Sequence, residues 1–145
     1  AESEHEEEDE GPEAAGLRLA AIGYCLGGQA VLELARSGAD FAAGVSFHGN
    51  FQTGRPASAE TPIKARLLIC HGDADPLAPR DSVIGLWDEL DAAGAHWHYH
   101  GYSGVKHNFT DPDSDKRGLA AIAYDASAAR QSWAAMHAFF DEIFG

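Results

Sequence analysis

Three side chains in this sequence have the types and positions that nucleophilic catalysis needs: Cys25, Asp75 and His107. Cys25 lies between two glycines in GYCLGG, Asp75 lies in HGDADPLAP, and His107 lies in GYSGVKHNFTDP. In such a set the thiolate attacks a carbonyl carbon, and the histidine takes the thiol proton and later protonates the leaving group. The carboxylate orients the histidine and stabilises its cationic form. The three residues therefore indicate acyl transfer.

Each of these roles has a competing interpretation. Cys25 has the alternative interpretation of a small, inert residue packed in the core. Cys70, at the end of a predicted strand, is expected to be such an inert core thiol. Asp73 competes for the role of the acid, although its position favours a turn-capping function. His48 and His71 each follow an apolar run and precede a glycine, so each is either an alternative base or a turn residue.

Short apolar runs alternate with amphipathic segments, which predicts strands alternating with helices. We expect strands at 17–23, 41–47, 65–70 and 96–102, and helices at about 29–37, 81–93 and 124–143, the second capped by Asp81 or Ser82. This order is typical of an α/β fold with a mainly parallel sheet of about four strands and flanking helices. Functional groups gather where parallel strands end, so Cys25, His48, Asp75 and His107 are expected at one edge.

Cys25 occupies the turn between the first strand and the first helix, which is the position of a nucleophile elbow. Gly23 and Gly27, two residues to either side, are expected to avoid collisions with neighbouring backbone at this tight turn. The N-terminus of the following helix would favour the thiolate form. The N–H of Leu26 would serve as one oxyanion donor.

The helices also carry predictions about packing. The apolar residues of the first helix leave Glu33 and Arg36 facing outward. On the last helix, one apolar side is expected to pack inward; it consists of Trp133, Met136, Phe139 and Phe140.

The sequence resembles the dienelactone hydrolase family in four segments: GYCLGGQAVLELARSGADFAAGVSFHGNFQTG, LLICHGDADPLAP, YSGVKHNFTDPDSD and AYDASAARQSW. The likeness extends in order and spacing from residue 17 to the end of the chain, and it includes a cysteine rather than a serine at the elbow. It implies an α/β-hydrolase fold and hydrolysis of small carboxylic esters or lactones through an acyl-thioester, without a cofactor. By matching motifs, it assigns the nucleophile, acid and base to Cys25, Asp75 and His107.

The first half of the family's usual fold has no counterpart in this sequence. Family members normally have roughly a hundred residues before the elbow, which supply a second oxyanion amide and a glutamate beside the cysteine. The resemblance therefore implies a truncated α/β-hydrolase domain over residues 17–145. The strand at 17–23 would be an exposed edge, which favours pairing with another chain. We expect a homo-oligomer or a partner chain that covers this strand, and the alternative function is a non-catalytic remnant or subunit that acts by association.

The loop after His107 bears on the choice of substrate. The resemblance implies that dienelactone hydrolases proper grip the substrate carboxylate with arginines, one of them shortly after the catalytic histidine. Asp111 and Asp113 lie in this loop here, and we expect them to repel an anionic substrate. A broader esterase is therefore favoured over a dienelactone enzyme.

The net charge of −13 is concentrated at the start of the chain. The segment AESEHEEEDE carries seven acidic residues and no lysine or arginine, which leaves −6 (13 minus 7) for the other 135 residues. We expect residues 1–16 to be disordered, because like charges repel and nothing there can be buried. The rest lacks the basic excess that a nucleic-acid surface needs.

The apolar runs and the two cysteines indicate where in the cell the protein is expected. No apolar run reaches the ~18 residues that span a bilayer, and no secretory signal is evident, so we expect no membrane partner. Two distant cysteines do not make a disulfide framework, which favours a cytoplasmic location.

Three histidines alternate in HWHYH, at positions 96, 98 and 100, and would share one face of a strand. Alternating histidines are either part of a zinc site or a solvated face opposite packed Trp97 and Tyr99. We favour the solvated face, because no cysteine or carboxylate follows at ligand spacing, and we predict no metal site.

Overall fold

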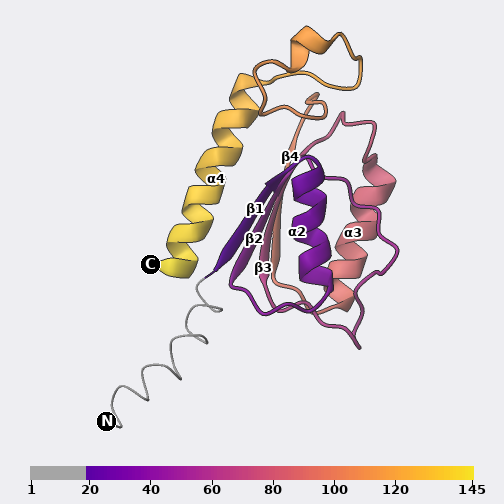
Figure 1. The fold of residues 1–145 in the computed structure, drawn as a ribbon, viewed down its shortest axis with the longest axis vertical. Helices are drawn as coiled ribbons and strands as arrows, with labels where there is room; N and C mark the ends of the chain where they lie inside the picture. The colour runs from indigo at the N-terminus through magenta and orange to yellow at the C-terminus, as the bar shows by residue number, and fades with distance from the viewer. Residues whose placement is uncertain (1–18) are drawn as a thin grey trace.

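A computed structural model describes residues 19–145, so the acidic segment predicted to be disordered at 1–16 lies outside the described residues. The described chain forms one four-stranded parallel sheet with helices on both faces (Figure 1). The elements in chain order are β1 (Ala20–Tyr24), α2 (Leu26–Arg36), β2 (Ala43–Phe47), β3 (Arg66–Gly72), α3 (Arg80–Ala92), β4 (Trp97–Tyr102), the 3-10 helix η1 (Ser114–Arg117) and α4 (Ala126–Phe144). The predicted α/β fold with a parallel sheet is confirmed.

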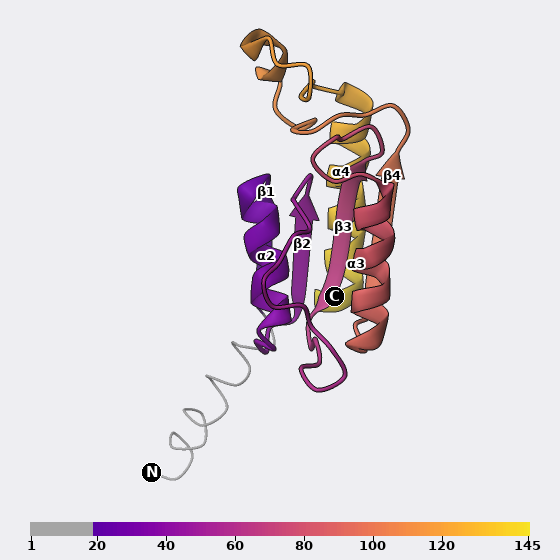
Figure 2. The same cartoon turned by 90° about the vertical axis from the view of Figure 1, so that its right-hand side faces the viewer.

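The strands lie in the order β1-β2-β3-β4, and each is parallel to the next. One face of the sheet is covered by α4 and the other by α2 and α3, as the two views in Figures 1 and 2 show. Because all four strands run in the same direction, their carboxyl ends meet at one edge of the sheet. The loops that follow the strands are therefore brought together there.

Each face of the sheet has its own apolar core. On one face, Leu32 of α2 and Leu86 of α3 belong to the same buried cluster as Ile69 of β3. On the other face, Met136 of α4 lies in a cluster with Phe47 of β2. The central strands β2 and β3 are buried along nearly their whole length, as expected for parallel strands covered on both faces.

The histidine row of HWHYH lies on β4, at an edge of the described sheet. His96, His98 and His100 are exposed, whereas Trp97 and Tyr99 are half-buried against the cluster under α3. The solvated interpretation of this row is confirmed.

The prediction that Arg36 faces outward is wrong, because its side chain is buried and paired. Its Nε and Nη2 donate to the Glu89 carboxylate at 2.7 and 2.9 Å, and Nη2 also donates to the Phe51 carbonyl at 3.0 Å. Glu89 accepts a further hydrogen bond from the Ala57 N–H at 2.8 Å. The pair therefore joins α2, α3 and the helix-free connection between β2 and β3.

Trp133 also departs from its prediction, since it is 49% exposed rather than packed inward. The other predicted residues of this side behave as expected, with Met136 and Phe139 buried and Phe140 packed against them.

Although α4 is the longest described helix, no helix within residues 19–145 is both long and apolar enough to cross a membrane.

Two helix starts differ from the sequence-based prediction. The first turn of α2 includes Gly27 and Gly28, so the helix begins at Leu26 although glycine disfavours helices. Helix α3 begins at Arg80 after Pro79, and neither Asp81 nor Ser82 caps it, because both lie inside the helix. Pro79 is the N-cap residue, with φ −71° and ψ 171°, and it offers no side-chain oxygen to the first N–H groups of the helix.

Replacing Arg36 by methionine should destabilise the protein strongly, because Glu89 would remain as a buried charge without its partner. Breaking a buried pair in this way costs about 3–5 kcal/mol of unfolding free energy. Urea denaturation followed by circular dichroism measures this loss. The matched control is Lys116→Met, which breaks the exposed Lys116–Asp113 pair and should cost at most about 1 kcal/mol. Equal losses in the two variants would contradict this account of Arg36.

Candidate active site

Cys25 forms the turn between β1 and α2 with a backbone conformation that few residues adopt, φ 60° and ψ −120°. Among residues 19–145, the non-glycine residues with positive φ are Cys25, His48 and Asn108. All three lie at the edge where the strands end, Asn108 directly after His107. Strained backbone of this kind clusters at functional sites, where the surrounding structure holds it in place. The tight turn between strand and helix that the sequence predicts at Cys25 is therefore present.

The glycines around Cys25 have different roles from those expected. A Cβ added to Gly23 would lie 2.0 Å from the Gly27 carbonyl oxygen, so the need for glycine at this position is confirmed. A Cβ on Gly27 would meet no described atom within 4 Å, so the predicted steric need there is wrong. The steric requirement for glycine lies at the next residue instead, since a Cβ on Gly28 would lie 2.6 Å from Ser46 Oγ and 3.1 Å from Gly49 Cα. The helix crosses the end of β2 at Gly28.

Cys25, His107 and Asp75 form a continuous chain of polar contacts. Cys25 Sγ lies 3.0 Å from His107 Nε2, and His107 Nδ1 lies 2.8 Å from Asp75 Oδ2. The other oxygen of Asp75 accepts a hydrogen bond from the Leu77 N–H at 2.9 Å. Asp75 and His107 are buried, whereas Cys25 is only partly buried. Cys25 is therefore the most exposed of the three residues.

Backbone contacts fix the two loops that carry the acid and the imidazole. The Ala74 N–H donates to the Val105 carbonyl at 2.9 Å, which ties the loop after β3 to the loop after β4. His107 pairs with the segment around Ile122, donating to Ala121 at 3.1 Å and accepting from Ala123 at 3.2 Å. These contacts determine where the carboxylate and the ring lie before any ligand arrives.

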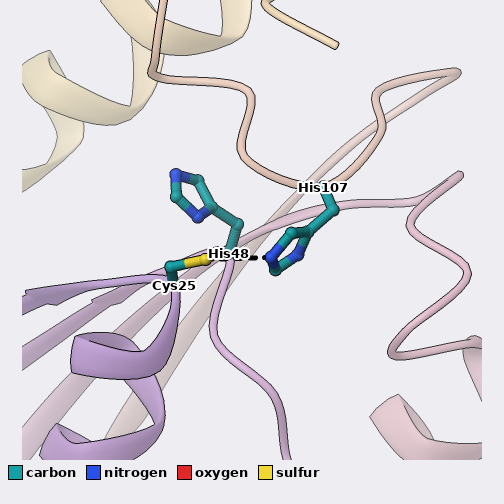
Figure 3. A group of neighbouring side chains, drawn as sticks. All are labelled: Cys25, His48 and His107. Atoms are coloured by element: carbon teal, nitrogen blue, oxygen red, sulfur yellow. Dashed lines mark hydrogen bonds between the residues drawn. The ribbon is translucent and has the colours of Figure 1, made fainter. Parts of the chain in front are cut away.

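His48, one of the rival bases, lies in the same site but is held differently. Its Nε2 is 2.8 Å from Thr110 Oγ1, and its ring is edge-on to the His107 ring with centroids 5.6 Å apart. Burial, together with the nearby His107, lowers the pKa of His48 to about 4. A base with so low a pKa is poorly matched to neutral pH. His48 therefore lies at the expected edge and adjoins both Cys25 and His107 (Figure 3).

The remaining candidates lie elsewhere or are otherwise engaged. His71 Nε2 contacts the Ala78 carbonyl at 2.9 Å, and Asp73 binds Arg80 through both oxygens at 3.0 and 2.7 Å. Cys70 is fully buried, and burial raises the pKa of its thiol to about 12, so it stays protonated at neutral pH. Asp75 is thus the carboxylate that contacts His107, in preference to Asp73.

Comparison with known proteins identifies the family of this chain. The sequence model of the dienelactone hydrolase family matches residues 5–144. The chain belongs to the dienelactone hydrolase family. An uncharacterized protein of Caenorhabditis elegans is 31% identical over 128 residues, which is 88% of this chain and 81% of that protein.

Two solved structures resemble this family member closely. One, named m3DLH, has a TM-score of 0.80 at 41% identity over 88% of this chain and 53% of that chain. The other is described as a dienelactone hydrolase-like promiscuous phosphotriesterase from metagenomic libraries, with a TM-score of 0.79 at 40% identity over 87% of this chain and 52% of that chain. The chain therefore spans about half the length of these structures, and its fold is that of a truncated α/β-hydrolase.

The acidic loop of this family member carries compensating cations. Asp113 pairs with Lys116 at 3.1 Å, and Asp111 lies 3.8 Å from Arg117. The expected repulsion of an anionic substrate rests on unpaired carboxylates, and these ion pairs weaken that repulsion.

Leu26, the expected oxyanion donor, is the first residue of α2, where N–H groups have no acceptor within the helix.

Gly23→Ala and Gly27→Ala form a matched pair that tests the elbow. The new methyl group at position 23 would collide with backbone, so we expect a loss of at least about 1–3 kcal/mol in unfolding free energy. At position 27 the methyl group has space, and alanine favours the helix, so stability should hold or rise by up to about 1 kcal/mol. Thermal unfolding measures both. The elbow geometry would be refuted if Gly23→Ala were tolerated as well as Gly27→Ala.

Proposed function

We propose that this member of the dienelactone hydrolase family hydrolyses small carboxylic esters or lactones, with Cys25 as nucleophile, His107 as acid and base, and Asp75 as the residue that orients His107. The observation that carries the proposal is the contact chain from the Cys25 sulfur through both nitrogens of His107 to Asp75. A thiol, a base within reach of it and a group that orients the base are the signature of covalent catalysis.

In the proposed acylation step, Cys25 Sγ gives its proton to His107 Nε2 and attacks the ester carbonyl carbon. The negative charge that develops on the carbonyl oxygen is stabilised by the Leu26 N–H at the start of α2. The intermediate collapses when the C–O bond to the leaving group breaks, and His107 protonates the departing alkoxide. Asp75 stabilises the imidazolium that exists between these two proton transfers.

The acyl-thioester is then hydrolysed by the same groups. His107 Nε2 takes a proton from a water molecule, whose oxygen attacks the thioester carbonyl. The C–S bond breaks, and the sulfur leaves as a thiolate that recovers the proton from His107. The carboxylic acid product is released, and Cys25 is ready for a second substrate.

Cys25→Ala and His107→Ala should each abolish turnover of a short aryl ester such as p-nitrophenyl acetate. Asp75→Asn should reduce it by about 10³–10⁴-fold, since an amide supports the wrong tautomer of the histidine. Release of p-nitrophenol measures the rate. Asp73→Asn is the matched control, because Asp73 binds Arg80 and not His107, and this variant should retain wild-type turnover. Unchanged turnover in Cys25→Ala or His107→Ala would refute the proposal.

Alkylation by iodoacetamide reports on the thiol without any substrate. Mass spectrometry should find Cys25 labelled and the buried Cys70 unlabelled, with slower labelling of Cys25 in His107→Ala. A reactive Cys25 without ester turnover would favour the second candidate function below.

The second candidate function is that of a subunit that works by association along β1. Within the described chain, β1 pairs only with β2, so it is an edge of the sheet. Ile22 and Tyr24 of this strand are 45% and 40% exposed, and Trp133 of α4 is 49% exposed. Tyr24 and Trp133 line the same cavity of about 290 Å³. An apolar edge of this kind is suited to pairing with a second copy or a partner chain.

Ile22→Lys should weaken this association, because it places a charge on the proposed contact strand. Sedimentation of the 145-residue chain is expected to give dimers or larger species, and the variant is expected to shift toward the monomer. Ile84→Lys is the matched control, since Ile84 is 51% exposed on α3, away from β1. A wild-type chain that remains monomeric at all concentrations would exclude self-association and leave only a separate partner.

A further inference from the structure

Cys25, His48 and His107 form a cluster that hydrolysis alone does not explain. Each residue offers one nitrogen or sulfur ligand atom, and these atoms all lie within 4.8 Å of one another. Figure 3 shows the three side chains converging from three separate segments of the chain. One thiolate and two imidazoles are a ligand set that zinc accepts readily. The proposed reaction uses Cys25 and His107 but gives His48 no function.

His48 contributes an unused ligand atom to this cluster. The residue is 1% exposed, and its Nδ1 has no hydrogen-bond partner among residues 19–145. Its other nitrogen is engaged with Thr110 Oγ1 at 2.8 Å. A buried ring nitrogen without a partner is costly, and it therefore needs an explanation. A bound cation would supply the missing partner.

Both imidazoles are already supported in the way that metal-binding histidines usually are. Such a histidine typically uses one nitrogen for the metal and the other for a carboxylate, hydroxyl or carbonyl that fixes the ring. His107 has Asp75 Oδ2 on Nδ1 at 2.8 Å, which leaves Nε2 facing the sulfur. His48 has Thr110 on Nε2, which leaves Nδ1. The nitrogens that remain are the two that a metal would need.

The separations are compatible with a tetrahedral ion. Zinc bonds of about 2.3 Å to sulfur and about 2.0–2.1 Å to nitrogen place such ligands roughly 3.5 Å apart. Cys25 Sγ and His107 Nε2 are 3.0 Å apart, and no pair of the ligand atoms exceeds 4.8 Å. Side-chain shifts of about 1 Å therefore close the site around an ion. Cys25 is only partly buried, so a water molecule is the expected fourth ligand.

We propose that Cys25 Sγ, His48 Nδ1 and His107 Nε2 bind Zn²⁺, and that this binding reversibly blocks the thiol. When the ion binds, a Zn–S bond replaces the S–H bond, and the thiol proton passes to the solvent. The sulfur and the His107 lone pair are then both occupied. Zinc binding and ester hydrolysis therefore exclude one another. This mutual exclusion rests on the proposed function, whereas zinc binding itself does not depend on it.

Cobalt substitution tests the site without any measurement of activity. Titration of the chain with Co²⁺ should give one equivalent of a tetrahedral complex with a thiolate-to-cobalt charge-transfer band in the near ultraviolet. Cys25→Ser, which barely changes the shape of the side chain, should lose this band. His48→Gln and Asp75→Asn should each weaken binding by at least about 10–100-fold. Zn²⁺ should displace the cobalt and protect Cys25 from iodoacetamide until a chelator is added.

The exposed histidines of β4 provide the control. His98→Gln removes the middle of that row and should leave the charge-transfer band unchanged, because His98 lies within β4 beside Phe139 of α4 and does not belong to the cluster. Circular dichroism checks that each variant is folded. A band that persists in Cys25→Ser, or one that disappears in His98→Gln, would overturn the proposed site.

Ester turnover separates the two proposals. Loss of turnover on adding Zn²⁺, with recovery after chelation, is the expected result. A rise in turnover with Zn²⁺ would overturn the inhibitory role, because the ion would then be supplying the attacking water. If the chain shows the cobalt band but no turnover under any condition, the zinc site stands and the hydrolytic function fails.

Discussion

The hydrogen bond between His107 Nδ1 and Asp75 Oδ2 is the interaction on which the site depends. It fixes the ring so that Nε2 faces the Cys25 sulfur, and it is possible only because two loops far apart in the sequence meet. The parallel sheet produces this meeting, since β3 and β4 are neighbours and end at the same edge. The bond from Ala74 to Val105 then locks the two loops together. The proposed transfer of the Cys25 proton to His107 depends on this arrangement.

Local sequence patterns were sufficient to predict the architecture and the meeting of the loops that carry Cys25, Asp75 and His107. Strand and helix periodicities are short-range properties, and the carboxyl-edge rule converts them into a prediction of which loops converge. Interactions between distant segments were not predictable in this way. Arg36 has the spacing of an exposed residue, and its burial depends on Glu89, which lies 53 residues away. The position of Gly28 under Ser46 and Gly49 likewise depends on how α2 crosses β2.

His48 illustrates a second limit of sequence-based prediction. Its place after β2 was predictable, but its contact with the Cys25–His107 pair depends on strand order, which the sequence does not specify. With β2 next to β1, the residue after β2 lies beside the residue after β1. This neighbour relation gives the site a third ligand atom. The same geometry therefore suits both the proposed nucleophile and the proposed ion that would block it.

Cys25 follows β1, an edge strand of the described sheet, whereas Asp75 and His107 follow β3 and β4 on the other side of β2. Proteins open locally as well as globally, and elements with few buried apolar contacts open at a lower free energy than the core. Detachment of β1 from β2 would carry the sulfur away from the imidazole while both apolar cores stayed intact. The distance between the sulfur and the imidazole therefore depends on whether a five-residue edge strand stays paired, and local opening of this strand would separate them without global unfolding.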